Sequence, residues 1–156
     1  MSITPQDFKQ ALARFASGVT VIAVRDGEGQ RGMTASAFLS VSLDPPLVLV
    51  SVGKKAQMHA HLQAGNDWSA SILAHDQAAH SGHFAGYGEA EVQWEAGVDG
   101  PPHLAGALSW VQCVPFAAHD AGDHTLFVGR VVAAGHHEGV PLVYAQGKYR
   151  DLVPLP

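Results

Sequence analysis

The sequence predicts a mainly β fold, an antiparallel barrel with a few attached helices, and two observations favour it. β-rich segments alternate with short glycine-containing turns, most clearly in the last third of the chain, at residues 107–114, 125–134 and 141–149. Helical patterns are few and short, whereas a doubly wound parallel sheet needs a long helix after every strand. The 156 residues are close to the usual size of one domain, so we expect a single domain over residues 1–156.

Composition narrows the classes of function. Apolar residues make up 47% of the chain and charged residues only 15%, which indicates a folded protein with less charged surface than a typical monomer and hence a buried subunit interface. The formal net charge of −5 gives no support for nucleic acid or an anionic membrane as partner. No apolar run reaches membrane-spanning length. Cys113 is the only cysteine and the start MSITPQDF has no features of a secretory signal, so we expect a soluble cytoplasmic protein.

The first segment predicts an amphipathic helix. Thr4 suits the N-cap, Pro5 the first turn, and Asp7 the acidic position of a capping box. One face carries the apolar residues Phe8, Leu12, Phe15 and Ala16. We therefore expect the helix to pack on an apolar surface and to end at Gly18.

Further elements follow in order along the chain. Strands are expected at residues 19–24 and 68–73, with DGEGQ as the turn after the first of them. Short helices are expected around residues 58–62, ended by Gly65, and over HDQAAHSGHFAG. Residues 89–95 alternate in polarity and predict an edge strand, and HDAGDH predicts a loop between two strands.

Residues 32–55, GMTASAFLSVSLDPPLVLVSVGKK, carry the most distinctive polar pattern. In an extended chain the hydroxyls of Thr34, Ser36, Ser40 and Ser42 project to one face. That row is either a solvent-facing sheet surface or the contact face for a polar ligand such as a phosphorylated cofactor. Gly53, Lys54 and Lys55 precede a predicted helix, where they are either solvated or a phosphate cradle. No GxxxxGK[ST] motif is present, so a nucleotide P-loop is not indicated.

Ten histidines call for a test of metal binding. For the pairs His59 with His61 and His80 with His83, the sequence indicates no third ligand. A closed zinc site requires four ligands, so we expect no metal site. In HDAGDH, two roles are open for Asp123. It either caps the backbone of the turn, or it orients His124 in the way that a carboxylate orients a general base. A Ser-His-Asp hydrolase is not indicated, because no GxSxG elbow occurs.

Three ordered motifs resemble those of a known family. They are GMTASAFLSVSLDPPLVLVSV, GDHTLFVGRV and PLVYAQGKY, and the likeness runs from FKQALARFASGVTVIAV to Tyr149 with HFAG in register. They are similar to the flavin reductase-like family, the small NAD(P)H:flavin oxidoreductases (EC 1.5.1-like) that supply two-component monooxygenases. The resemblance implies an FMN-binding split β-barrel that binds FMN, or FAD in some members. It also implies NADH or NADPH as co-substrate, a homodimer, and a separate monooxygenase as partner.

The resemblance further implies roles for individual residues. The segment along the isoalloxazine edge is Met33, Thr34, Ala35 and Ser36. The segment near the flavin phosphate is Ser51, Gly53, Lys54 and Lys55. Beside the flavin lie Phe84, the catalytic His124, which is also near the nicotinamide, and Tyr149. This chain has Ala37 and Lys55 where many relatives have serine.

A sparse site of this kind suits the implied chemistry, since hydride transfer is carried by the two cofactors and the protein mainly stacks them. Three alternatives stay open from the sequence: a flavoredoxin-like FMN protein that passes electrons to another protein, a non-catalytic flavin-binding protein, and a haem-binding split barrel that uses a histidine.

Overall fold

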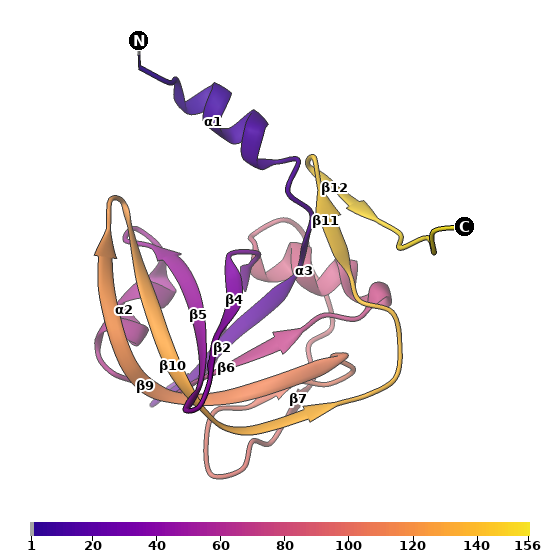
Figure 1. Cartoon of the computed structure of the whole chain (residues 1–156). Helices are drawn as coiled ribbons and strands as arrows, with labels where there is room; N and C mark the ends of the chain where they lie inside the picture. Colours follow the sequence, from indigo (N-terminus) through magenta and orange to yellow (C-terminus); the bar gives the residue numbers. More distant parts are fainter. Residues whose placement is uncertain (1) are drawn as a thin grey trace.

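The computed structural model describes residues 2–156, and its main element is a seven-stranded antiparallel sheet with the order β3-β2-β6-β9-β10-β5-β4 (Figure 1). Met1, part of the expected domain, lies outside the described residues. The strands of this sheet are β2 (Thr20–Asp26), β3 (Gly29–Ala35), β4 (Phe38–Leu43), β5 (Pro46–Gly53), β6 (Trp68–Ile72), β9 (Ser109–Ala121) and β10 (His124–His136). The predicted mainly β, antiparallel fold with attached helices is confirmed.

Shorter elements surround this sheet. A three-stranded sheet has the order β1-β11-β12, and a second small sheet pairs β7 with β8. Their strands are β1 (Ser17–Gly18), β11 (Val143–Ala145), β12 (Lys148–Arg150), β7 (Trp94–Glu95) and β8 (His103–Leu104). The helices are α1 (Pro5–Leu12), α2 (Gln57–Gln63) and α3 (Ala78–Phe84), the last preceded by a 3₁₀ turn at His75–Gln77. No helix among residues 2–156 is long and apolar enough to cross a membrane.

The large sheet curls until its two edge strands approach each other. Only Ser36 and Ala37 join β3 to β4, and the backbone N–H of Ser51 on β5 donates to the Ala37 carbonyl at 3.0 Å. Within residues 2–156 the strands β3 and β4 do not pair, so the curled sheet stays open between them. This junction brings the ends of β3 and β5 together.

The core lies inside the curl of the sheet. Trp68 on β6 is buried and lies against the backbone of Gly129 on β10, where a Cβ would be 2.6 Å from the indole ring. Met58 and Leu62, four residues apart on α2, enter the same core and hold this short helix against the sheet. α2 therefore has a fixed position beside the open junction of β3 and β5.

The N-terminal helix differs from its prediction in two respects. Thr4 caps it as expected, accepting from the Asp7 N–H at 3.1 Å. It ends at Leu12 and not at Gly18, because the Ala13 carbonyl is taken by the N–H of Gln146 (2.7 Å) and Gly18 is extended in β1. It also packs on nothing within the described chain: α1 has no buried residue and projects away from the sheets (Figure 1).

Three other expectations are corrected. The HDAGDH segment is mostly strand, because Gly122 with its positive φ of 67° allows a tight turn directly between β9 and β10. Of residues 89–95 only Trp94 and Glu95 form a strand. The predicted row of four hydroxyls is broken, since the chain leaves β3 after Ala35 and the register of β4 shifts between Ser40 and Ser42.

Candidate functional site

The end of β3 carries the first group of predicted site residues. Met33 and Thr34 are partly buried, Ala35 is buried, and Ser36 is exposed just beyond the strand. The Thr34 hydroxyl donates to the carbonyl of Ser81 on α3 at 2.7 Å, so it is not free to donate to a ligand. Ser36 is thus the hydroxyl of this group that is open to a ligand.

The end of β5 carries the second group and lies beside His124. Gly53 is directly opposite His124 in the β5–β10 register, and Ser51 is opposite Leu126. Lys54 turns toward the β9–β10 hairpin: its N–H donates to the Asp123 carbonyl at 2.9 Å and its ammonium pairs with Asp120. Lys55 is exposed to solvent.

His124 is held by its neighbour in the chain. Asp123 Oδ1 lies 2.7 Å from His124 Nδ1, and this hydrogen bond is the main cause that lowers the pKa of Asp123 from its ordinary 3.8. An ionised carboxylate only accepts, so Nδ1 is the donor. The other edge of the ring, with Nε2, passes over Gly53 at 3.8 Å from where a Cβ would be. Of the two readings of Asp123, the structure has the one in which it orients His124.

Phe84 and Met33 meet in a cavity of about 300 Å³. Its walls come from β3, the start of α2 and the end of α3, and its lining residues are Arg31, Gly32, Met33, Ala56, Gln57, Met58, His61, Phe84, Ala85 and Gly86. The Phe84 ring lies against the backbone of Gly32, where a Cβ would be 2.6 Å from Cε1. A thioether and an aromatic ring give this cavity a wall that suits a flat ring system.

Tyr149 and Thr34 are joined through one buried residue. The Tyr149 hydroxyl donates to Ser81 Oγ at 2.8 Å, while Thr34 donates to the carbonyl of the same serine. Ser81 is only 3% exposed. It therefore connects three elements: the C-terminal hairpin of β11 and β12, α3, and the part of β3 that is predicted to lie along the flavin ring.

Sequence reasoning missed several residues around these groups. Ser81, Arg31, Gln57 and His61 belong to no motif that was recognised, and only their positions in the folded chain bring them to the site. A signal existed for His61, which stands four residues after Gln57 and so shares a helix face with it. Across residues 2–156, no group of three or more His, Cys, Asp or Glu side chains is arranged to hold a metal ion.

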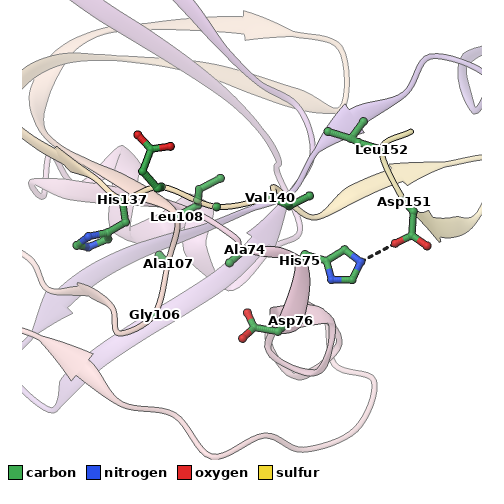
Figure 2. Close-up of a pocket in the computed structure, with 12 residues that line it drawn as sticks. Ala74, His75, Asp76, Gly106, Ala107, Leu108, His137, Val140, Asp151 and Leu152 are labelled. Atoms are coloured by element: carbon green, nitrogen blue, oxygen red, sulfur yellow. Dashed lines mark hydrogen bonds and ion pairs between the residues drawn. The ribbon is translucent and has the colours of Figure 1, made fainter. Parts of the chain in front are cut away.

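A second cavity, of about 690 Å³, contains none of the predicted site residues (Figure 2). Its apolar wall includes Ala107, Leu108 and Val140, and the pair of His75 with Asp151 lies at its edge. Its lining comes from four segments that are far apart in the sequence, so no sequence motif indicated it. The smaller cavity is the better candidate site, because it holds Met33 and Phe84 together.

The fold and the site define the class: an antiparallel β protein with an aromatic-walled cavity beside β3 and a histidine at the start of β10, opposite the end of β5. Residues 12–153 match the family model "Flavin reductase like domain", and the chain belongs to this family. It is 45% identical to an NADH-dependent flavin reductase of Rhodococcus sp., covering 96% of this chain and 88% of that one. It is 47% identical to the reductase component of 4-hydroxyphenylacetate 3-monooxygenase of Thermus thermophilus, covering 94% and 95%.

Solved structures agree with this relationship. The chain superimposes on the flavin reductase PheA2 in its native state with a TM-score of 0.93 and 41% identity, covering 97% of this chain and all of that one. It superimposes with a TM-score of 0.89 and 34% identity on the NADH:FAD oxidoreductase SgcE6 of Streptomyces globisporus in complex with NAD and FAD fragments, covering 99% and 98%. The expected family is confirmed.

Proposed function

We propose that this chain is an NAD(P)H-dependent flavin reductase (EC 1.5.1-like) that reduces FMN or FAD and supplies the reduced flavin to a separate monooxygenase. Family membership along residues 12–153, together with the cavity that Met33 and Phe84 line, carries the proposal. Relatives named as the reductase component or reductase subunit of a monooxygenase support the partner. The nicotinamide and flavin supply the hydride chemistry when they are bound.

The chain's own residues have to bind, orient and shield the two rings. Met33 and Phe84 give an apolar wall, and the backbone and exposed hydroxyl of Ser36 would make polar contacts to the ring edge. Thr34, Ala35 and Tyr149 shape the same segment, the first and last through Ser81.

Near the other end of the site, we assign Ser51, Gly53, Lys54 and Lys55 to the flavin phosphate. His124, fixed by Asp123, faces the site over Gly53 as the proposed catalytic residue. With its Nδ1 proton held by Asp123, its Nε2 edge is the one that would contact the reacting rings.

Oxidation of NADH and NADPH by the purified protein, followed by the fall in nicotinamide absorbance, tests this function. We expect turnover that depends on added FMN or FAD. Absence of turnover with both nicotinamides would overturn the reductase and leave the flavoredoxin-like or non-catalytic flavin protein. An absorption spectrum separates the remaining alternative, because a Soret band in place of flavin peaks would indicate haem.

We also propose a homodimer, with α1 as part of its interface. Phe8 and Leu12 are 55% and 53% exposed on α1, which has no buried residue, and Phe15, three residues after its end, is 81% exposed. β4 adds exposed Leu39 and Leu43 at the open edge of the large sheet. Surfaces this apolar are typical of a buried interface between copies.

The proposal also includes the type of barrel, the extent of the domain and the cellular location. The curled sheet corresponds to the FMN-binding split barrel, with the gap between β3 and β4 as its split. Residues 1–156 act as a single domain, since one sheet and its core involve most of the chain. A cytoplasmic location fits a protein that draws on the cell's nicotinamide nucleotides.

A further inference from the structure

The histidine at the start of β10 and the cavity of Met33 and Phe84 meet at one short turn. This turn joins β5 to α2: Gly53 ends β5 under the Nε2 edge of His124, and Ala56, three residues later, lines the cavity. The Ala56 N–H donates to the Gly53 carbonyl at 3.0 Å, so the Cα atoms at the two ends of the turn lie within about 7 Å of each other. The position of α2 relative to β10 therefore sets the distance between His124 and the cavity.

Backbone and apolar contacts fix only part of this arrangement. The Lys54 N–H donates to the Asp123 carbonyl at 2.9 Å, which ties the turn to the β9–β10 hairpin. Beyond the turn, Met58 and Leu62 hold α2 against the sheet through apolar contacts. Apolar contacts are not directional, so they leave the helix free to shift along the strand. A polar contact between α2 and β10 would fix its position.

His59 makes that contact. It lies in the first turn of α2, and its Nε2 is hydrogen-bonded to the hydroxyl oxygen of Thr125 on β10 at 2.8 Å. Its ring also meets the edge of the Phe127 ring, with 5.3 Å between the ring centroids. Thr125 and Phe127 are two residues apart on β10, so both point to the inner face of the sheet, where they are 6% and 4% exposed. His59 thus holds β10 by one polar and one aromatic contact.

Thr125 is the neighbour of His124 in the chain. Successive residues of a strand point to opposite faces, so Thr125 is held on the inner side of β10 while the His124 ring lies on the outer side. Within residues 2–156, His59 is the only hydrogen-bond partner of the Thr125 hydroxyl. A buried hydroxyl that loses its partner is destabilised, so the bond favours this one position of α2.

The other histidine of α2 has a different partner. His61 approaches Asp26 on β2, with 3.9 Å between its Nε2 and the carboxylate Oδ2. The two histidines therefore leave α2 in different directions, and it is His59 that reaches β10.

We propose that His59 is a positioning residue: through Thr125 it fixes the distance between His124 and the cavity that takes the flavin ring. This inference rests on the proposed flavin reductase function. His59 does not line the cavity, and it lies on the opposite side of β10 from the His124 ring. It therefore acts on the relative placement of the two parts of the site and not on the binding of either cofactor.

Three variants of the full chain test the contact. His59→Leu removes Nε2 but keeps an apolar side chain against Phe127, and Thr125→Val removes the hydroxyl with little change in shape. For both we expect kcat with NADH and FMN to fall about threefold to tenfold, because small displacements of reacting groups are costly, with the Kd of FMN changed by less than about twofold. His59→Gln places an amide nitrogen close to the position of Nε2 and should recover most of the rate.

A matched control and a double variant separate positioning from general stability. His136→Leu makes the same substitution at an exposed histidine at the far end of β10, and it should leave kcat unchanged. In the His124→Ala background, His59→Leu should cause no further fall in kcat, because the group that it positions is absent.

Independent effects in this pair would overturn the proposal. If His59→Leu lowers kcat by the same factor with and without the His124 ring, the contact only stabilises the fold. The proposal also fails if the Kd of FMN rises as much as kcat falls, since His59 would then shape the cavity itself.

The ¹H–¹⁵N resonances of the His124 ring in the flavin-free protein give a readout that does not need turnover. His59→Leu and Thr125→Val should shift these resonances alike, and His136→Leu should not shift them. Resonances that stay in place in all three variants would show that His59 does not position His124. If they shift as expected but the wild type shows no turnover with either nicotinamide, the placement of His124 by His59 stands and the reductase function fails.

Discussion

The carboxylate of Asp123 accepts a hydrogen bond from Nδ1 of His124 at 2.7 Å, which leaves the Nε2 edge of the ring over Gly53. Both residues belong to the tight turn between β9 and β10, so the chain itself sets the geometry of the pair. The imidazole is half exposed, at 47% of its side-chain surface, and is open to a ligand above the end of β5. This geometry leads directly to two variants.

His124→Ala should lower the turnover number more than it weakens flavin binding. The ring makes no contact with the cavity of Met33 and Phe84, so removing it leaves that wall intact. We expect a fall in kcat of about tenfold or more, in the range for a positioned side chain, with flavin Kd changed by less than threefold. Stopped-flow reduction and flavin fluorescence titration measure the two separately. An unchanged steady-state rate would show that His124 has another role.

Asp123→Ala should give a milder form of the same defect. The imidazole remains but loses the acceptor that fixes its orientation, and because the pair is exposed we expect a loss in kcat of only about twofold to fivefold. Asp123→Asn keeps an oxygen acceptor and should recover part of the rate. If both variants behave like His124→Ala, Asp123 acts on more than the orientation of the ring.

Much of the fold was predictable because it depends on local chemistry. Thr4 caps α1, Gly65 with its positive φ follows α2, and adjacent Asp123 and His124 pair as neighbours. These features need no knowledge of the rest of the chain. The antiparallel sheet was likewise predictable from segments whose residues favour strands.

The remainder depends on contacts between distant segments. Ser81 joins Thr34, 47 positions away, to Tyr149, 68 positions away, and no local pattern contains such a contact. The end of α1 was missed because a carbonyl near its end is taken by Gln146 from the far end of the chain. The ion pair of Lys54 with Asp120 was not predicted, because Asp120 lies within reach of Lys54 only once β9, β10 and β5 have paired.

Gly32→Ala tests how closely Phe84 is seated. A Cβ at Gly32 would lie 2.6 Å from Phe84 Cε1, so the ring has to move, and overpacking of this kind costs about 1–3 kcal/mol. Because Phe84 lines the cavity, we also expect a higher KM for FMN. Gly27→Ala is the control, since no atom lies within 4 Å of the added carbon. Urea unfolding and the kinetics with FMN measure the two effects. If Gly32→Ala and Gly27→Ala behave alike, Phe84 is not packed tightly against Gly32.

Tyr149→Phe and Ser81→Ala should be coupled. The hydroxyls share one hydrogen bond, worth about 0.5–1.5 kcal/mol to the free energy of unfolding. The double variant should therefore cost less than the sum of the two single variants, by an amount in that range. Urea unfolding of the four proteins in the cycle measures this. Strict additivity would mean that the bond does not stabilise the C-terminal hairpin.

Cys113 should be unreactive in the folded protein. It is 1% exposed on β9, and burial raises the pKa of its thiol from the ordinary 9.0 to about 12. The thiolate is the reactive form, so Ellman's reagent at pH 8 should label one thiol only after denaturation. The protonated thiol's contribution to stability is complete below pH 9 and is lost as the pH rises toward 12. Rapid labelling of the native protein would reveal local opening between β6 and β9.

Leu12→Glu should separate the proposed homodimer. Burying a leucine or phenylalanine stabilises an interface by about 1.5–3 kcal/mol, and a carboxylate at that position would also have to be desolvated. Gln10→Glu adds the same charge two positions away, on the opposite face of α1, and should leave the dimer intact. Light scattering coupled to size exclusion should give twice the chain mass for the wild type and Gln10→Glu, and the chain mass for Leu12→Glu. A monomeric wild type with full reductase activity would contradict the dimer, and the exposed face of α1 would then belong to a surface for another partner.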